Sequence, residues 1–336
     1  MRRVVHFIAS AWHVLSASAF LIFVASKRDD ARVPSSFKFR VPVSTEPGFV
    51  ASWTALCYDT KTRTTFNVSD LDTNFDADER CLLTLKPNPT PSLAFELPIL
   101  FIPAFCAYWS AFVHLCCGLF RIEDGYFIRR IRFCVDYGVT APLMLSATVA
   151  LWAARNVVAV VVYPIYLFLL LESAPWLEDL LVSRFDAECF VLVGIVLSVF
   201  VGTTLVPPID GAYHSLPDEA PASVWVAVIF FVSTFSIFLV PYILSILDRL
   251  RHSKTDAESD RAFVWYTACS MIAKTTLHAN VALVAAVQLL VEAQPLDTKP
   301  RISMEDAGVV AGLASGLAAL GGLVMLFSYY KFLKHQ

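Results

Sequence analysis

One lysine in this chain lies where a charged side chain is costly. Lys274 falls inside the apolar run 263–291, which is long enough to cross a bilayer, and His278 is the other residue there that can carry a positive charge near neutral pH. An ionisable residue at such depth marks a functional site by default. A buried lysine is easily kept neutral and nucleophilic, and it condenses with an aldehyde to a Schiff base. Retinal, a lipophilic aldehyde, is therefore the first cofactor to consider.

A protonated Schiff base in an apolar interior needs a counterion, and Asp136 is the best candidate. It precedes the stretch 138–153, which holds no other acid. At 1.5 Å per residue it lies about 14 Å along a helix that starts near residue 126. Lys274 lies about 16 Å along its own helix from the same side. The alternative is an interfacial aspartate that caps its helix.

Three further polar residues fall near this pair. Ser270 precedes Lys274 by one helical turn, so its hydroxyl can bond the Schiff base, or else bond back to its own helix carbonyl. His13 and His114 fall in the same half of their helices as Asp136. They are either packed bundle residues or a polar cluster that holds or receives a proton.

A long polyene also needs apolar walls. Phe231, Phe235, Phe238 and Tyr242 recur at helical spacing beside Pro241, which permits a kink. This aromatic stripe is a candidate pocket wall, although ordinary helix packing produces the same pattern.

The composition of the chain indicates that these residues lie within a membrane. The chain has 336 residues, 57% of them apolar and 16% charged, with a mean hydropathy of +0.62. These values are typical of an integral membrane protein. Eight apolar segments approach or exceed the length of a spanning helix: 4–26, 97–120, 133–153, 156–175, 189–206, 222–246, 263–291 and 307–332.

We therefore expect an all-α membrane protein with four units. They are a first transmembrane helix (1–26), an outer loop with a small β-element (27–96), transmembrane helices two to seven (97–292), and an extra C-terminal transmembrane helix with its tail (293–336). No P-loop, zinc-ligand spacing, dinucleotide fingerprint or basic patch is present. We expect no enzyme activity, no metal site and no nucleic-acid partner.

The basic residues orient this multi-pass protein in the membrane. Lys and Arg are more numerous in the loops that lie inside if the N-terminus is cytoplasmic. The segment 27–96 is then extracellular, on the plasma membrane or another membrane of the secretory route. Its Asn67-Val68-Ser69 is an N-glycosylation sequence. Cys57 and Cys81 could pair as a disulfide in an oxidising compartment, or remain two thiols beside an unused sequon.

Alternating and β-rich stretches predict strands in this outer segment. The residues 37–43 alternate apolar and polar side chains, with a proline suited to an edge strand. A second candidate strand covers 81–85. We expect a small β-element that caps the bundle.

Four motifs, in this order, resemble the heliorhodopsins, a family of seven-helix retinal proteins inverted relative to ordinary microbial rhodopsins. They are Trp12-His13, the stretch SAFVH at 110–114, the stretch DYGVTAPLM at 136–144, and Ser270-x-x-x-Lys274. Together they cover residues 1 to about 292. No single motif is specific, and their joint order carries the resemblance.

The resemblance implies roles for individual residues. Lys274 would bind retinal (all-trans) as a Schiff base, Asp136 would be the counterion and Ser270 would hydrogen-bond the Schiff base. His13 and His114 would line the polar cavity beside the counterion, and Met144 would line the retinal pocket. The family also implies a cytoplasmic N-terminus, a β-containing outer loop and a homodimer.

Three features depart from the family pattern. Asp136 replaces the usual glutamate, and Arg132 is one residue further from the acid than the pattern has it. An eighth apolar segment follows, with small residues at 312 and 316 that form a close-packing motif. This segment either extends a dimer or partner interface or is a lipid-facing anchor.

Light sensing, with a conformational change passed to a signalling partner or to the dimer, is our first functional prediction. Light-driven or light-gated proton or ion transport is the alternative. A pump usually has a second carboxylate further along the third helix, where this chain has Thr140 and Ala147. Glu188, with Glu172, could supply another proton path, or both could be interfacial acids. A third possibility is a non-photochemical receptor or structural membrane protein with a coincidental lysine.

Overall fold

A computed structural model describes most of the first 293 residues. The described residues are 2–28, 41–46, 49, 53–59, 65–68, 81–87, 92, 94–99, 101–120, 133–151, 155–183, 187–216, 218, 222, 225, 228–229, 237–238, 241–243, 246 and 260–293. The predicted segment 307–332 lies outside them, and 222–246 is described at scattered positions.

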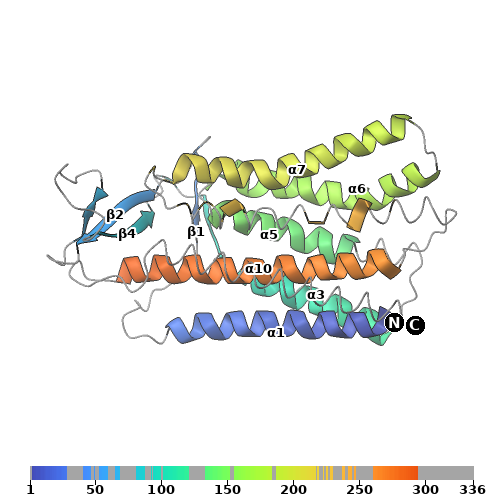
Figure 1. The fold of residues 1–336 in the computed structure, drawn as a ribbon, viewed down its shortest axis with the longest axis horizontal. Coiled ribbons are helices and arrows are strands. Elements are labelled where there is room, and N and C mark those ends of the chain that lie inside the picture. Colours follow the sequence, from blue (N-terminus) through green and yellow to red (C-terminus); the bar gives the residue numbers. More distant parts are fainter. Residues whose placement is uncertain are drawn as a thin grey trace.

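The α-helices of the described residues run roughly side by side along the long axis of the molecule (Figure 1). Two of them, α5 and α6, continue from short π-helical segments, η2 and η3. The elements are α1 (Arg2–Arg28), α3 (Phe101–Leu119), η2 (Phe133–Tyr137), α5 (Gly138–Leu151), η3 (Val158–Val162), α6 (Tyr163–Ser183), α7 (Ala187–Ser215) and α10 (Asp260–Ala293).

Four of the described helical stretches are long and apolar enough to cross a membrane: Arg2–Phe23, Phe101–Leu119, Val158–Leu180 and Val191–His214. Their outer faces expose large apolar side chains, such as Leu15 at 68% and Ile195 at 55%. Contiguous apolar surface of this kind favours lipid over water as the surrounding medium. These stretches support the predicted membrane protein, and the structure is mostly α-helical, as expected.

Two predicted segments end earlier than the helices that they became, and both helices continue through proline. The sequence placed ends at Pro175 and at Val206, but α6 continues through Pro175 to Ser183 and α7 continues through Pro207 and Pro208 to Ser215. Helices in membranes tolerate proline where a neighbouring group satisfies the freed carbonyl.

An example of such compensation lies at the start of α6. Pro164 has no N–H to offer the carbonyl of Val160, one turn earlier. The hydroxyl of Ser146, on the neighbouring α5, donates to this carbonyl at 2.9 Å. The freed backbone group is therefore satisfied, and the helix continues beyond the proline.

The predicted β-element is present between α1 and α3. A three-stranded antiparallel sheet has the order β3 (Thr65–Asn67), β2 (Trp53–Asp59), β4 (Cys81–Pro87), and a two-stranded sheet pairs β1 (Val41–Val43) with β5 (Phe95–Leu97). The strand predicted at 81–85 is confirmed, and β1 covers the end of the one predicted at 37–43. Figure 1 places β2 and β4 at the end of the bundle remote from the start of α1.

Backbone hydrogen bonds fasten the outer segment to the bundle. The Ser44 N–H donates to the Arg155 carbonyl at 2.7 Å, and the Val157 N–H donates to the Ser44 carbonyl at 3.0 Å. Asn156, between them, caps η3 by accepting from the Ala159 N–H at 2.8 Å. The segment is therefore held on the turn between α5 and η3.

The cysteine and asparagine predictions fall on this sheet. Cys57 is disulfide-bonded. The register pairs Cys81 with Asp59, two residues along β2 from Cys57, whereas the Cys81 side chain is outside the described residues, so the partner remains a prediction. Asn67 is exposed in β3 and accessible, as a glycan acceptor must be.

The core is built around α5, which packs against α3, α6, α7 and α10. Ala147 and Ala150 on this helix are completely buried, and small side chains let membrane helices approach closely. Because η2 leads directly into α5, residues of η2 lie at the centre of the bundle.

Candidate functional site

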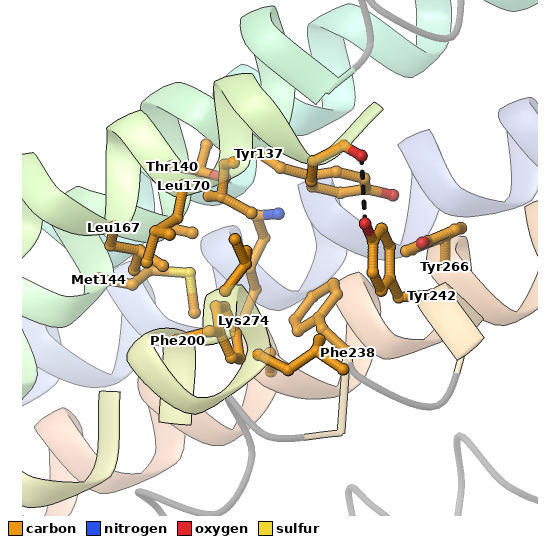
Figure 2. Close-up of a pocket in the computed structure, with 16 residues that line it drawn as sticks. Tyr137, Thr140, Met144, Leu167, Leu170, Phe200, Phe238, Tyr242, Tyr266 and Lys274 are labelled. Atoms are coloured by element: carbon orange, nitrogen blue, oxygen red, sulfur yellow. Dashed lines mark hydrogen bonds between the residues drawn. The ribbon is translucent and has the colours of Figure 1, made fainter. Parts of the chain in front are cut away.

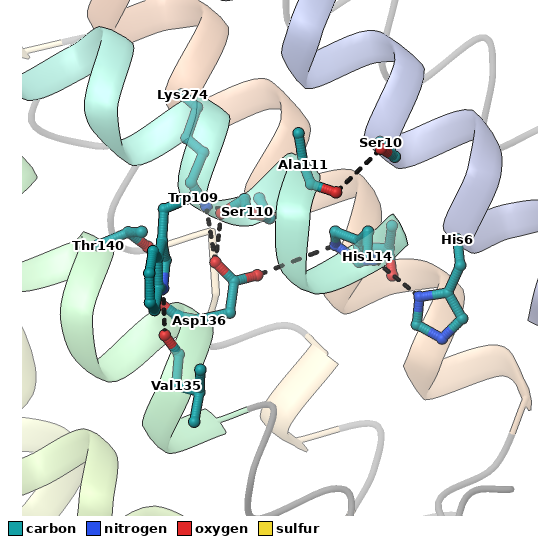
Figure 3. Close-up of polar contacts among 12 residues, drawn as sticks. His6, Ser10, Trp109, Ser110, Ala111, His114, Val135, Asp136, Thr140 and Lys274 are labelled. Carbon is teal, nitrogen blue, oxygen red and sulfur yellow. Dashed lines mark hydrogen bonds and ion pairs between the residues drawn. The ribbon is translucent and has the colours of Figure 1, made fainter. Parts of the chain in front are cut away.

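The amine of Lys274 lies inside the bundle, between a hydroxyl and a carboxylate. Its side chain is 2% exposed, and Nζ donates a hydrogen bond to Ser270 Oγ at 2.6 Å. Nζ is also 3.8 Å from Asp136 Oδ1 (Figure 3). Of the two alternatives for Ser270, the contact with the amine is the one that forms.

Asp136 is completely buried in η2. Ser110, from α3, donates a hydrogen bond to Oδ1. The Thr140 hydroxyl donates to the Asp136 backbone carbonyl at 2.9 Å, which satisfies a group in the π-helical turn. Asp136 is therefore a core residue aimed at the amine and not an aspartate that caps a helix in water.

A buried charge is stable only when it is paired and hydrogen-bonded. Here Lys274 has Asp136 and Ser270, Asp136 has Ser110, and the Tyr137 ring centroid lies 5.7 Å from Nζ. An aromatic face at that distance attracts a cation. The site is built to hold one positive charge at the end of the Lys274 side chain.

Three histidines extend this polar site away from the lysine. His114 Nε2 is 3.9 Å from Asp136 Oδ2, and His114 Nδ1 is 2.8 Å from His6 Nδ1. The His13 ring stacks on His114 with centroids 5.9 Å apart, and its nitrogens have no hydrogen-bond partner among the described residues. His114 thus lies beside the carboxylate, as predicted, with His13 one ring further.

His6 was missed by the sequence reasoning. It is 4% exposed, although it lies only four residues after Arg2 in α1. The signal was present: His6, Ser10 and His13 recur at i, i+4 and i+7 and so share one face of the helix. All three are buried, and Ser10 donates to the Ala111 carbonyl of α3 at 2.9 Å.

An apolar cavity extends from Lys274 in another direction. Most of its lining side chains are aliphatic or aromatic. Figure 2 shows Met144 and Leu167 to one side of the lysine and Tyr242 and Tyr266 to the other. Met144 and Phe238 line the cavity as predicted. Phe231 and Phe235 lie outside the described residues.

Other predicted residues do not join this site. His278, one turn after Lys274 on α10, turns towards α1, where its Nδ1 is 2.8 Å from Ser16 Oγ and its ring stacks on Phe20. The side chain of Glu188 is outside the described residues, and Glu172 is half-buried on α6. Glu178 lies beyond residue 175, where the fourth predicted segment ends, and the sequence analysis did not consider it. It is 1% exposed.

Comparisons with family models, curated proteins and solved structures find no match for this chain. The geometry of the site is therefore the basis for assigning a function.

Proposed function

We propose that this chain is a retinal-binding photoreceptor of the heliorhodopsin family, with seven transmembrane helices and an eighth at the C-terminus. The observation that carries the proposal is the position of the Lys274 amine. It lies at the boundary between a buried carboxylate and an apolar cavity, 3.8 Å from Asp136 and itself part of the cavity wall. An aldehyde with a long apolar tail needs both features at one amine.

The residues present fit retinal. The cavity walls are mostly aliphatic and aromatic, including Met144, Leu167 and Phe238, and side chains of this kind suit an apolar polyene. Retinal supplies light absorption and isomerisation when bound through a Schiff base to Lys274. Asp136 balances the positive charge at that nitrogen, and Ser270 holds the nitrogen in place by a hydrogen bond.

The remaining family expectations belong to the same proposal. They are a cytoplasmic N-terminus, an extracellular and glycosylated segment closed by a Cys57–Cys81 disulfide, a homodimer and a signalling partner. The strands between α1 and α3, the disulfide at Cys57 and the exposure of Asn67 support them.

Sensing is favoured over light-driven ion transport because α5 lacks a second carboxylate. Thr140 and Ala147, the positions where a pump would carry its second carboxylate, are both buried in the core. No acid is present at any described position of α5 after Asp136. Photocurrents in cells that express the protein test the transport alternative directly: a sensor gives none.

The absorption spectrum of the purified protein, expressed with all-trans retinal, tests the proposal. We expect a visible band in the wild type and none in Lys274→Ala. Lys254→Ala, which removes a lysine from a different part of the sequence, is the matched control and keeps the band. A wild-type protein without a visible band would overturn the retinal proposal and leave the third class, a non-photochemical membrane protein.

A further inference from the structure

The buried histidine that the sequence reasoning missed connects the site to one end of the bundle. His6 Nδ1 is 2.8 Å from His114 Nδ1, and the two rings belong to helices 108 residues apart in sequence. His114 Nε2 faces Asp136 at 3.9 Å, and Asp136 faces Lys274 at 3.8 Å. Figure 3 shows these side chains in one row, with His6 at the end remote from Lys274.

His6 lies near the start of α1, in a helical stretch that is long and apolar enough to cross a membrane. It follows Arg2 by four residues, or about 6 Å along α1. The neighbouring side chains are consistent with a boundary position: the Arg2 guanidinium lies 5.4 Å from the Phe263 ring centroid, and His6 contacts the same ring edge-on at 4.9 Å. His6 is therefore buried near the start of α1, about one turn from Arg2.

The charged and titratable groups around His6 are few among the described residues. Arg2 and Arg3 precede it on α1, and His114 faces it from α3, with Asp136 behind His114. From α10 it meets the uncharged Phe263 ring. An imidazole has a proton affinity suited to exchange near neutral pH, and its two nitrogens can accept a proton on one side and donate on the other.

We propose that His6 transfers protons between His114 and the aqueous phase at the N-terminal face of the membrane. The proposal rests on the proposed retinal function, because light must first make the Lys274 nitrogen release its proton. That proton passes to the Asp136 carboxylate, which then protonates His114 Nε2. His114 Nδ1 gives its proton to His6 Nδ1, and His6 Nε2 releases one to water.

Each group accepts one proton and donates one, so the chain of transfers balances. Two of its gaps, 3.8 and 3.9 Å, exceed hydrogen-bond length, and a bridging water or a small side-chain rotation closes a gap of that size. The reverse path restores the dark state.

The residues that line the apolar cavity beside Lys274 include no histidine and no carboxylate. Beyond Lys274 the cavity walls are apolar, and the nearby hydroxyls bond backbone carbonyls: Thr148 donates to Met144 at 2.7 Å and Ser146 to Val160 at 2.9 Å. The proposed relay leads to the N-terminal end of α1, and the proton returns by the same groups. Such exchange signals light without net transport.

Flash spectroscopy with a water-soluble pH-indicator dye tests this relay. The full-length protein, loaded with all-trans retinal in nanodiscs, should acidify the dye transiently after a flash. In His6→Phe, which keeps a ring against Phe263, the rate of proton release should fall by roughly 10²-fold, the lower end of what a positioned proton-transfer group contributes. The visible band should keep its position.

Two variants complete the design. His6→Asn keeps a hydrogen-bonding group beside His114 without a titratable one, and it should show the same loss if His6→Phe does not fold. His214→Phe removes a histidine that is 57% exposed and paired with Asp210, and it should leave proton release unchanged.

The outcomes separate the two proposals. A wild-type protein with no visible band overturns the retinal function itself. A visible band with dye responses in His6→Phe and His6→Asn within about twofold of wild type overturns the relay and leaves the retinal function standing; so does a wild type that gives no dye response.

Discussion

The two halves of the bundle that meet at Lys274 have opposite chemistry. Towards the N-terminal end of α1 the interior contains Asp136, His114 and His6, all buried and in contact. In the other direction it contains a cavity lined by side chains such as Met144, Leu167 and Phe200. The first region, here called the polar half, contains groups that exchange protons, and the second, the apolar half, contains side chains suited to an apolar ligand. The Lys274 amine lies at the boundary and contacts both regions.

The largest expected effect comes from removing the charge in the polar half. Asp136→Asn takes away the anion 3.8 Å from Nζ, so the protonated Schiff base loses its stabilising partner. We expect the pH midpoint at which the visible band converts to a near-ultraviolet band to fall by about two units, within the roughly one to three that an opposite charge at this distance contributes. Spectrophotometric titration measures it.

Asp210→Asn is the control for this titration, since it removes an acid that is 64% exposed and paired with His214. An unchanged midpoint in Asp136→Asn would mean that another group is the counterion. The role assigned to the polar half would then be wrong.

Filling the apolar half should give the next largest effect. Met144 is 4% exposed and lines the cavity, so Met144→Trp places an indole where the polyene would lie. We expect retinal uptake by the unloaded protein to become slow and incomplete, with helix content unchanged. The growth of the visible band and far-ultraviolet circular dichroism measure the two quantities.

Ile195→Trp adds the same ring on α7 at a side chain that is 55% exposed, and it should bind retinal normally. Equal uptake in Met144→Trp and Ile195→Trp would show that the cavity is not the retinal site.

The smallest effect concerns the hydroxyl beside the amine. Ser270→Ala removes the acceptor at 2.6 Å from Nζ, and a hydrogen bond to a charged group contributes about 1.5–3 kcal/mol. The same titration midpoint should therefore fall by roughly one to two units, less than in Asp136→Asn, since about 1.4 kcal/mol corresponds to one unit.

Thr267→Ala lies about one turn earlier on α10 and removes a hydroxyl that only bonds back to the Phe263 carbonyl at 2.9 Å. It should leave the midpoint in place. A larger shift in Thr267→Ala than in Ser270→Ala would reverse the assignment of the two hydroxyls.

The sequence predicted the parts of the site that follow from cost and helical spacing. Lys274 and Asp136 stand out because charge is rare in apolar segments, and Ser270 follows from one turn of helix. Their meeting in the core could be expected only from the family resemblance and from similar depths along two helices. That Phe231 and Phe235 line the pocket stays a prediction, since the structure does not describe them.

The positions of three other buried residues could not be predicted from the sequence, because they depend on contacts between distant segments. His6 reads as an interfacial residue beside Arg2 and Arg3, and its burial becomes visible only when α3 brings His114 against it. Glu178 was overlooked because Pro175 was taken as a helix end, whereas in the bundle the helix continues beyond it. His278 follows Lys274 by one turn and lies near the same face of α10, yet its Nδ1 contacts Ser16 on α1, a contact that the helical spacing alone does not reveal.

The most direct test of the central claim is chemical trapping of the cofactor on its lysine. The protein loaded with all-trans retinal would be treated with borohydride under illumination, which reduces a Schiff base to a stable amine, then digested and analysed by peptide mass spectrometry. We predict a retinyl adduct on Lys274 and on no other lysine. An adduct on a different lysine, or a reduced protein that carries none, would contradict the claim that Lys274 holds retinal.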